Sequence, residues 1–331
     1  MSDYKTIKGH QIDVLDSDPS NPVLGQIWYN SSEEKVKVQK VGAGAWATSG
    51  TLNTARLQGG GDGIQTAALM AGGVGPPDAV VDETEEYNGS AWSEVGDLIV
   101  ARRYTAVAGT TSAAVCAGGW DGSTRFTNSE EWNGTGWTEG NNLGTGRYGH
   151  GACGTQTAGL IGPGDDPALS ALTEEYDGTD WTAGGTTNTT RYELQICGTQ
   201  TAAVGSGGSG VSPTVGHTEE YNGTDWTEGN NANYLRDYCQ IFGTQTAAVM
   251  AGGQTPAATP RNNNPDDIVE EWNGTSWATS TTMNSARSLG MSGGTNTAGL
   301  VQGGKVATPG GGQNSGEEWT TPPATETVTH A

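Results

Sequence analysis

Pairs of neighbouring carboxylates are the residues of this sequence that could do chemistry. In the stretch TEEYNGSAWSE, residues 84–94, Glu85 and Glu86 stand next to Tyr87. Two carboxyl groups can hydrolyse a glycosidic bond when they flank it. Adjacent residues of a β-strand point to opposite faces of the sheet, so two neighbours in a strand cannot flank one substrate. The pair therefore predicts a structural role, with an ion pair as its simplest form.

The same stretch returns four more times along the chain, which also argues against catalysis. The copies are SEEWNGTGWTE from residue 129, TEEYDGTDWTA from 173, TEEYNGTDWTE from 218 and VEEWNGTSWAT from 269. A catalytic site is a single constellation, so it breaks the symmetry of a repeat. Five copies indicate architecture, and we predict no catalytic residue.

Four of the copies contain a glycosylation sequon, at Asn88, Asn133, Asn222 and Asn273. Each Asn is followed by Gly, the dipeptide that a two-residue hairpin favours because both central positions need positive φ. The sequons are therefore interpreted as turns, and glycosylation stays as the alternative.

Cysteine spacing gives no metal motif. Cys153 and Cys197 hold the same place in adjacent repeats, which predicts that they lie on neighbouring strands. Buried free thiols are the expected state of all four cysteines, with a redox or disulfide role as the alternative. The full set is Cys116, Cys153, Cys197 and Cys239.

The histidines and the acidic loop pairs give no clear site either. His150 falls in an expected inner strand and could line a central channel. Asp165-Asp166 and Asp266-Asp267 could hold Ca²⁺ loosely, although solvated loop charge is the simpler interpretation. We predict no metal and no cofactor. The four histidines lie in unrelated places, at His10, His150, His217 and His330.

The period of the repeat is set by arginines, each ten residues before a Thr or Ser. A Gly/Ala-rich run after each Arg predicts an inner strand, and TAALMAGG (66–73) is typical of the second strand. The EEY or EEW segment is the third strand and the Trp segment the fourth. Four short antiparallel strands in each of six units predict a β-propeller. The six arginines are Arg56, Arg102, Arg147, Arg191, Arg236 and Arg287.

Closure of the ring follows from one missing strand. The sixth unit has EEW at 317–319 but no Trp segment after it. Trp46 precedes Arg56 by ten residues, and the same interval separates Trp92 from Arg102. We predict that the strand carrying Trp46 completes the last blade and removes its exposed edge.

These landmarks resemble the kelch repeat over about residues 46–319. In the first unit they are Arg56, Gly72-Gly73, Glu85 with Tyr87, and Trp92. The resemblance implies an all-β, six-bladed kelch-like propeller in which one Glu of each pair meets the repeat Arg. The third unit departs from the pattern, with Pro163-Gly164 in place of Gly-Gly, so its turn after the second strand is expected to differ.

Composition excludes several classes of partner. The net charge is −22 with only 15 Lys and Arg, which argues against nucleic acid and anionic membranes as partners. No apolar run approaches a membrane span, and the polar start MSDYKTIKGHQ lacks the apolar core of a signal peptide. We expect synthesis in a cytoplasm. The predicted domains are an N-terminal extension, 1–41, the propeller, 42–320, and a C-terminal tail, 321–331.

The extension contains NPVLGQIWYNSSEEKVKVQKV (21–41), whose alternation predicts a hairpin that turns at Ser31-Ser32-Glu33. It is similar to short Gly-x-Ile/Leu-Trp-Tyr-Asn segments of bacteriophage tail-fibre and other virion proteins, and propellers rich in GTQTA and YNGTxW look like virion proteins of marine phages. The resemblance implies a non-enzymatic virion structural protein, in the tail or as a capsid decoration. Its partners would be other virion proteins, through residues 1–41, and a host-surface glycan or protein.

Two other classes remain open. A cytoplasmic kelch-type module that docks a protein partner would have the same fold, although such adaptors usually carry a further recruiting domain. An enzyme built on a propeller, such as a lyase or an oxidase, is the third class. The Tyr, Cys and two His that hold copper in some kelch-like oxidases have no counterpart here.

The repeats differ in length in one place, the loop that joins the second strand to the third. All six of these loops must emerge on the same face of the disc, and binding residues concentrate in such loops on a rigid scaffold. Drift in unconstrained loops is the alternative explanation. We predict partner contacts on this face at Trp120, Arg125 and Phe126 in the second loop and at Arg261, Asn262, Asn263 and Asn264 in the fifth, the longest.

Overall fold

The computed structural model is all-β and divides into two compact units. Unit 1 comprises Met1–Ala45 and Thr320–Ala331, and unit 2 comprises Trp46–Trp319. The structure describes residues 6–7, 10–166, 169–210, 216–255, 265–306 and 311–328.

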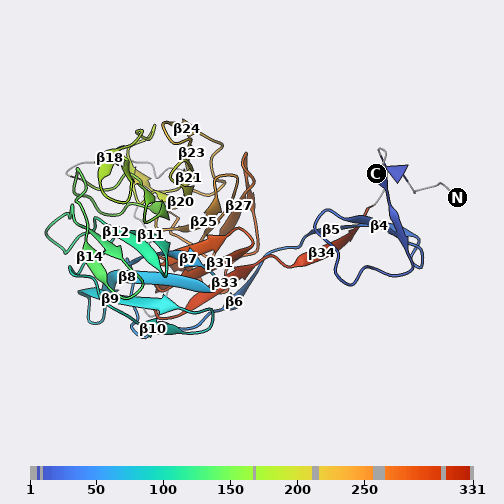
Figure 1. Ribbon diagram of the computed structural model, residues 1–331, viewed down its shortest axis with the longest axis horizontal. Coiled ribbons are helices and arrows are strands. Elements are labelled where there is room, and N and C mark those ends of the chain that lie inside the picture. Colours follow the sequence, from blue (N-terminus) through green and yellow to red (C-terminus); the bar gives the residue numbers. More distant parts are fainter. Residues whose placement is uncertain are drawn as a thin grey trace. The chain divides into compact units, whose positions relative to one another are not determined.

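Unit 2 contains one four-stranded antiparallel sheet for each repeat, in a β-propeller-like arrangement (Figure 1). The sheets of the first three repeats are β7 (Gly60–Ile64), β8 (Ala67–Gly75), β9 (Ala79–Tyr87) and β10 (Trp92–Glu94); β11 (Ala106–Thr110), β12 (Ala113–Ala117), β13 (Ser129–Trp132) and β14 (Trp137–Glu139); and β15 (Ala152–Thr155), β16 (Ala158–Ile161), β17 (Glu174–Tyr176) and β18 (Trp181–Ala183).

The next three repeats follow the same order. Their strands are β20 (Gln195–Thr199), β21 (Ala202–Ser206), β23 (Thr218–Tyr221) and β24 (Trp226–Glu228); β25 (Gln240–Thr244), β26 (Ala247–Ala251), β27 (Val269–Trp272) and β28 (Trp277–Thr279); and β30 (Met291–Thr295), β31 (Ala298–Gln302), β33 (Gly316–Thr320) and β6 (Ala45–Thr48). Two short ladders accompany them, β19 (Arg191–Tyr192) with β22 (Ser209–Gly210) and β29 (Arg287–Ser288) with β32 (Lys305–Val306).

The turn between the third and fourth strands differs from the predicted two-residue hairpin. In the first repeat Tyr87 pairs with Trp92, which leaves four residues in the turn. Only Gly89 has positive φ there, at 89°. The Oδ1 atom of Asn88 accepts hydrogen bonds from the backbone N–H groups of Ser90 and Ala91, at 3.0 Å each. Asn is needed as a side-chain acceptor that stabilises the turn, so only Gly must adopt the left-handed conformation.

The innermost strands lie side by side around a common centre. β7 contacts β11, and the series continues through β15, β20, β25 and β30, which contacts β7. A ring of backbone hydrogen bonds runs over one end of these strands. Tyr104 N donates to Gln58 O (2.6 Å), and Gln58 N donates to Leu289 O (2.9 Å). We call this the amide ring, and its members, each two residues after a repeat Arg, are Gln58, Tyr104, Gly149, Glu193, Tyr238 and Leu289.

Every member of the amide ring has a left-handed backbone, with φ between 52° and 63°. Five of the six are not glycine, and a left-handed non-glycine residue costs about 1–2 kcal/mol. Five hydrogen bonds between successive members offset this strain, because the donating N–H groups would otherwise lack an acceptor. The five donors are Gln58, Tyr104, Gly149, Glu193 and Leu289.

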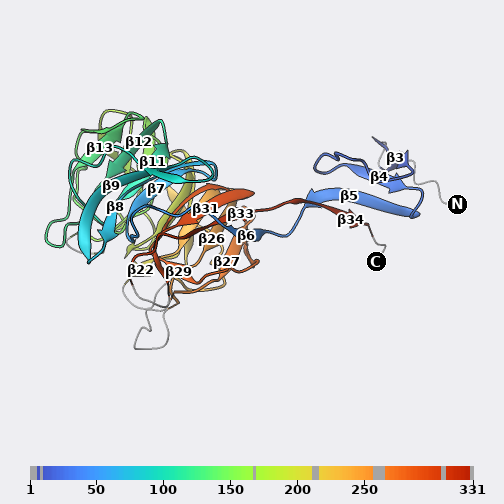
Figure 2. The same ribbon diagram turned by 90° about the horizontal axis from the view of Figure 1, so that it is seen from below.

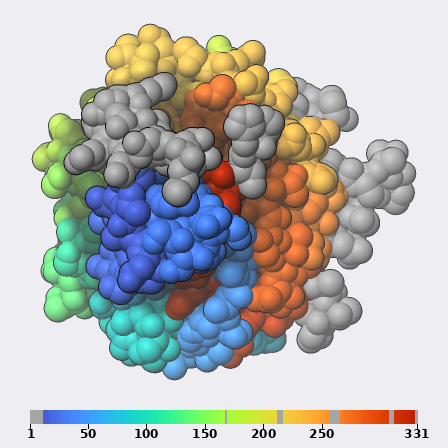
Figure 3. Space-filling view, turned by 90° about the vertical axis from the view of Figure 1, so that its right-hand side faces the viewer, coloured from blue at the N-terminus to red at the C-terminus, as the bar shows by residue number. Residues whose placement is uncertain are grey.

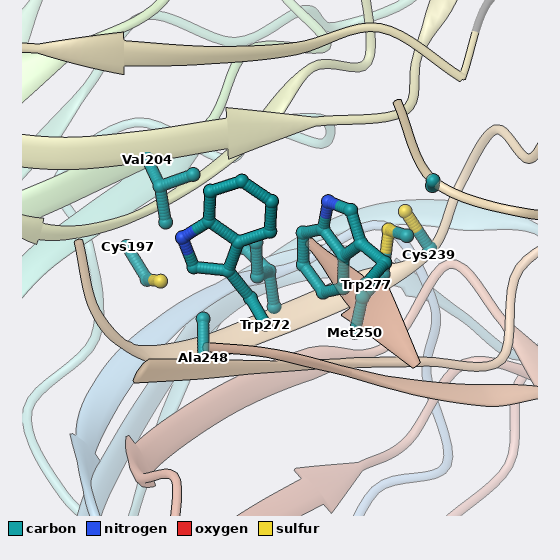
Figure 4. Packing of buried hydrophobic residues seen from close by; sticks show 9 residues of the cluster. Cys197, Val204, Cys239, Ala248, Met250, Trp272 and Trp277 are labelled. Carbon is teal, nitrogen blue, oxygen red and sulfur yellow. The ribbon is translucent and has the colours of Figure 1, made fainter. Parts of the chain in front are cut away.

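The hydrophobic core lies between neighbouring sheets. Figure 4 shows one such layer, where Trp272 and Trp277 lie side by side with Cys197 and Val204 of the preceding sheet. The rings of Trp272 and Trp277 are 5.3 Å apart, and both side chains are buried. Aromatic residues of the third and fourth strands thus fill the gap between two blade-like sheets, which explains why both recur in every copy of the repeated stretch.

The segment carrying Trp46 is the fourth strand of the last sheet, as the spacing predicts. Its ring lies 5.2 Å from the ring of Trp319 and 6.4 Å from that of Phe242. The indole Nε1 donates to Thr281 O at 3.2 Å. The first and last parts of unit 2 are therefore joined in one sheet.

Unit 1 contains a four-stranded sheet of its own, formed by β3 (Asp13–Leu15), β4 (Ile27–Asn30), β5 (Lys35–Val41) and β34 (Pro323–Thr327). The predicted hairpin is confirmed, since β4 and β5 pair antiparallel (Figure 2). A further pair, β1 (Thr6–Ile7) with β2 (His10–Gln11), precedes it.

The predicted C-terminal tail is in part a strand. β34 pairs antiparallel with β5, from Pro323 opposite Val41 to Thr327 opposite Lys37. The consecutive Pro322 and Pro323 disguised it, because proline removes a donor and normally argues against a strand. At the edge of a sheet, where one side of the strand needs no donor, proline is tolerated. Residues 329–331 lie outside the described residues.

Candidate functional site: the loop face and the central cavity

The loops that join the second to the third strands share one end of the sheets with the segments that follow each repeat Arg. In each repeat these two segments pair: Arg103 bridges Trp120, and Tyr148 bridges Asp165. The same ladder joins Leu57 to Val74, Asp237 to Gln254, β19 to β22 and β29 to β32. We call this end of unit 2 the loop face.

The six repeat arginines are buried and each contacts the first Glu of a carboxylate pair. Arg191 Nη2 lies 2.9 Å from Glu219 Oε1, and its Nη1 donates to the carbonyls of Gly207 and His217. Burial lowers the pKa of Arg191 to about 10, against the opposing effect of Glu219. The expected ion pairs are thus confirmed. The others are Arg56–Glu85, Arg102–Glu130, Arg147–Glu174, Arg236–Glu270 and Arg287–Glu317.

The second Glu of several pairs accepts a hydrogen bond from a different sheet. Tyr87 Oη donates to Glu318 Oε1 at 2.6 Å, and Tyr221 Oη donates to Glu175 Oε1 at 2.5 Å. Burial and the hydrogen bond to Glu175 raise the pKa of Tyr221 to about 12. The two carboxylates of a pair therefore face different partners, as their places on opposite faces of a strand require.

Sequence reasoning missed a glutamine that links neighbouring sheets. In GTQTA, Gln200 Nε2 donates to Gly159 O (3.0 Å) and Tyr176 O (2.8 Å) of the preceding sheet. Gln65 reaches Gly299 O and Trp319 O in the same way. Its recurrence at a fixed place in the repeat was the signal that could have revealed it.

Two of the predicted contact residues are brought together on the loop face. The ring of Trp120 stacks on that of Tyr148 at 5.1 Å and 16°. Arg125 pairs with Asp165 at 2.7 Å, and Tyr148 Oη donates to the same carboxylate at 2.8 Å. Arg103, which was not predicted, lies 4.5 Å from the Trp120 ring centroid.

Phe126 has a more structural position than predicted. It lies 5.5 Å from the guanidinium carbon of the buried Arg102, and its backbone N–H donates to Gly119 O. Phe126 thus covers an ion pair and is only half-buried itself. The predicted contacts of the fifth loop, Arg261, Asn262, Asn263 and Asn264, lie outside the described residues.

A cavity of about 280 Å³ lies between the innermost strands, and the amide ring lines one end of it. Among its lining residues Asp62 is unusual, because the equivalent positions hold the neutral Ala108, Cys153, Cys197, Phe242 and Gly293. Its carboxylate accepts hydrogen bonds from Gly63 N (2.7 Å) and Gly109 N (2.9 Å). Burial nevertheless raises the pKa of Asp62 to about 7.

The cysteines and His150 are buried within unit 2. All four thiols are free, and Cys153 and Cys197 lie on the neighbouring inner strands β15 and β20. Burial raises the pKa of Cys239 to about 11. His150 lines the cavity, as the sequence allowed, and its Nε2 lies 3.1 Å from Ala117 O. Because burial lowers the pKa of His150 to about 3, its ring is neutral at physiological pH.

The acidic loop pairs are engaged with protein groups. Asp165 holds Arg125 and Tyr148, and Asp266 Oδ2 accepts hydrogen bonds from the backbone and the hydroxyl of Thr255, at 2.6 Å each. Within the described ranges, no group of three or more His, Cys, Asp or Glu side chains is arranged to hold a metal ion. No helix in that part of the chain is long and apolar enough to cross a membrane.

The raised pKa of Asp62 leads to a prediction about pH. A carboxyl whose pKa is raised by folding contributes stability below its unfolded pKa of 3.8, and that contribution is lost as the pH rises towards 7. Asp62→Ala introduces the residue type found at the equivalent position of the second repeat, Ala108. This variant is expected not to show the loss of stability with rising pH. Urea unfolding at several pH values between 4 and 8 would measure it.

Asp121→Ala provides the control of opposite sign. The backbone N–H of Thr124 and the other donors of its own turn lower the pKa of Asp121, so its contribution is present at neutral pH and lost on acidification. Parallel pH profiles of the wild type and the Asp62→Ala variant would contradict the assignment of the raised pKa to Asp62.

Comparison with known proteins bears on the fold. No protein-family model matches the chain, and no curated protein matches it by sequence. The solved structure of YjhT superposes with a TM-score of 0.68 at 12% sequence identity, over 84% of this chain and 99% of that one. At this identity the likeness concerns the fold alone. It supports the β-propeller-like arrangement of unit 2, and the function has to be argued from the residues.

Proposed function

We propose that this chain is a non-enzymatic phage virion structural protein that displays a six-bladed kelch-like β-propeller. Unit 1 attaches it to other virion proteins, in the tail or on the capsid. The loop face meets a host-surface glycan or protein. Attachment through unit 1 is supported most directly by the apolar side chains that this unit leaves exposed.

Unit 1 buries one face of its sheet and leaves the other open. On the covered face Lys37 Nζ and Asn30 Nδ2 donate to Asp18, both at 2.8 Å. The hydrogen bond from Lys37 contributes most to lowering the pKa of Asp18 to about 2. The covered face is thus held largely by polar contacts, and its fully buried large side chain is Trp28.

The opposite face of the same sheet carries a group of apolar side chains beside the exposed Lys40–Glu326 ion pair. Val14 pairs with Tyr29, and Ile27 pairs with Val38, so these side chains share one face. Val14 is 51% exposed and Ile27 39%. We call this the open sheet face of unit 1; part of the exterior of the unit appears in blue in Figure 3.

A small unit with so few buried apolar side chains has little hydrophobic stabilisation of its own. Among residues whose burial the structure describes, Ile12 and Trp28 are its buried large hydrophobic side chains. More of them are exposed: Val14, Val23, Leu24, Ile27, Val41 and Val328. Exposed apolar patches of this kind mark interaction sites. A protein surface in the virion would cover them.

The six-bladed, closed form of the propeller is part of this proposal. Its support is the series of six sheets, the contact between β30 and β7, and the sharing of one sheet by Trp46 and Trp319. A rigid closed disc suits display, because loops on one end can vary while the Arg–Glu pairs hold the scaffold.

The attachment is tested by changing the open sheet face. The double variant Val14→Asp, Ile27→Asp is expected to lower the copy number of this protein in purified virions about tenfold, because each charge would have to be buried in the interface. Quantitative mass spectrometry of virions measures it. Ile64→Asp, at a side chain of unit 2 that is 53% exposed, is the matched control and should leave incorporation unchanged.

Two outcomes would contradict the proposal. Full incorporation of the double variant would exclude the open sheet face as the attachment surface. Absence of the wild-type protein from purified virions would favour the cytoplasmic interaction module instead.

The loop face is tested by shortening the fifth loop. Deletion of residues 257–262 brings it to the length of its neighbours and keeps Thr255 and Asp266, which bind each other. Combined with Trp120→Ala, it is expected to leave folding and incorporation intact and to slow adsorption of virions to host cells. Adsorption at the wild-type rate would show that the loop face takes no part in binding to the host.

A further inference from the structure

We propose that Arg103 and Trp120 form a binding site for a carboxylate on the loop face. We call it the Arg103 site. This inference gives the chemical class of the group that the loop face binds. It rests on the proposed function in one respect, that the loop face is the one that meets a partner.

The cations of the described residues are nearly all used by carboxylates. The six repeat arginines are each paired with a buried Glu. In unit 1, Lys37 contacts Asp18 and Lys40 contacts Glu326. On the loop face Arg125 contacts Asp165. Arg103 differs, because no carboxylate of the described residues lies within ion-pair distance of its guanidinium.

The guanidinium of Arg103 is held against aromatic rings. Its Cζ atom lies 4.5 Å from the centroid of Trp120 and 5.9 Å from that of Tyr104. Backbone hydrogen bonds in both directions, 3.0 Å and 2.9 Å long, fix Arg103 beside Trp120. Trp120 in turn stacks on Tyr148, whose hydroxyl is bound by Asp165. The group is therefore pre-organised, which reduces the entropy that a ligand must overcome.

An acid near the Arg103 site does not neutralise it. Asp121 follows Trp120 directly, but its Oδ1 accepts the backbone N–H groups of Ser123 (2.7 Å) and Thr124 (2.6 Å) within its own turn. The Nε of Arg103 is buried without an acceptor in the described structure, as is the Nε of several repeat arginines, so a ligand would bind through the Nη groups. A guanidinium without a carboxylate partner favours an incoming anion, since a charge-assisted hydrogen bond is about twice as strong as a neutral one.

The geometry favours a carboxylate over a phosphate. The indole lies 4.5 Å from the guanidinium Cζ, and a planar carboxylate can accept two parallel N–H bonds from the Nη groups. The net charge of −22 repels a dianion more strongly than a monoanion. A singly charged carboxylate is therefore the ligand that the site fits.

The test is an NMR titration of the full-length, ¹⁵N-labelled protein. Sodium acetate replaces sodium chloride at constant ionic strength, and the Nε–H signals of Arg103 and Trp120 are followed. Both are expected to shift saturably. Arg125 is the internal control, because its Nε–H already donates to Asp165 at 3.1 Å. Arg103→Lys, which loses the two-pronged hydrogen bond, should weaken the acetate response of the Trp120 signal about tenfold, and Lys40→Gln should not change it.

Three results would overturn the assignment. If a titration with sodium chloride alone shifted the two signals equally, the response to acetate would be simple charge screening. A response to phosphate without one to acetate would refute the preference for carboxylate. An unchanged response in Arg103→Lys would remove Arg103 from the site. None of these depends on finding the protein in virions, so this inference and the proposed function can fail separately. Glucuronate and N-acetylglutamate, titrated in parallel, distinguish a sugar acid from an acidic side chain as the source of the carboxylate.

Discussion

Deletion of residues 1–49 is expected to unfold unit 2 or to convert it into oligomers. The deletion removes β6 and with it Trp46, which packs on Trp319 and Phe242. It also leaves one edge of β33 without a partner strand, while the other edge still pairs with β31. An unpaired apolar edge is a template for pairing with another chain. Size-exclusion chromatography and thermal melting followed by circular dichroism would measure the result.

Deletion of residues 1–20 is the control for this experiment. It removes β3 and Asp18 from unit 1 but leaves β6 in place. Unit 2 should keep its melting temperature in this shorter deletion. A monomeric, cooperative melt at the wild-type temperature after removal of 1–49 would refute the role of Trp46 in joining the first and last repeats.

Replacement of Arg191 by Ala is expected to lower the free energy of unfolding by about 3–5 kcal/mol. Removing one partner of a buried ion pair leaves an uncompensated charge, here Glu219. The carbonyls of Gly207 and His217 lose their donor as well. Asn188 still donates to Glu219, through N and Nδ2, which limits the loss. Chemical denaturation with urea would give the difference directly.

Arg125→Ala is the matched control, because Arg125 also pairs with a carboxylate but lies at the surface. Exposed ion pairs contribute at most about 1 kcal/mol. Equal effects of the two substitutions would mean that burial does not set the strength of the repeat pairs. If Arg191→Ala kept full stability and lost only ligand binding, the ring of arginines would be a site and not a scaffold.

Residues that have the same structural role in every repeat could be predicted from the sequence. Arg191 lies ten residues after Trp181 and Glu219 lies seven residues before Trp226, intervals that their counterparts keep, and Trp46 was identified by its distance from Arg56. Such landmarks recur because each packs in the same surroundings, so one repeat explains the others. The hairpin of unit 1 was predictable for a similar reason, since its alternation of side chains has the period of a strand.

Features that depend on contacts between distant segments could not be predicted. β34 contains Pro323, and only its place at the edge of the sheet makes that proline acceptable. Arg103 looked like the neighbour of a repeat Arg, and its role depends on the bridge to Trp120, 17 residues away. Asp62 stood in a glycine-rich strand, and only its position in the cavity wall perturbs its pKa. Left-handed Tyr104 and Leu289 gave no signal, because the residue type there varies from repeat to repeat.

The amide ring bears on how the molecule comes apart. Each link takes its donor from one repeat and its acceptor from another, and the link from Gln58 to Leu289 couples the first repeat to the sixth. In an open array of repeats a terminal unit can fray by itself, because it has one neighbour. Here every repeat has two. Partial unfolding of a single repeat would break the contacts of its inner strand on both sides, so unit 2 should lose its structure in one concerted transition. Fragments of two or three repeats should not persist after limited proteolysis.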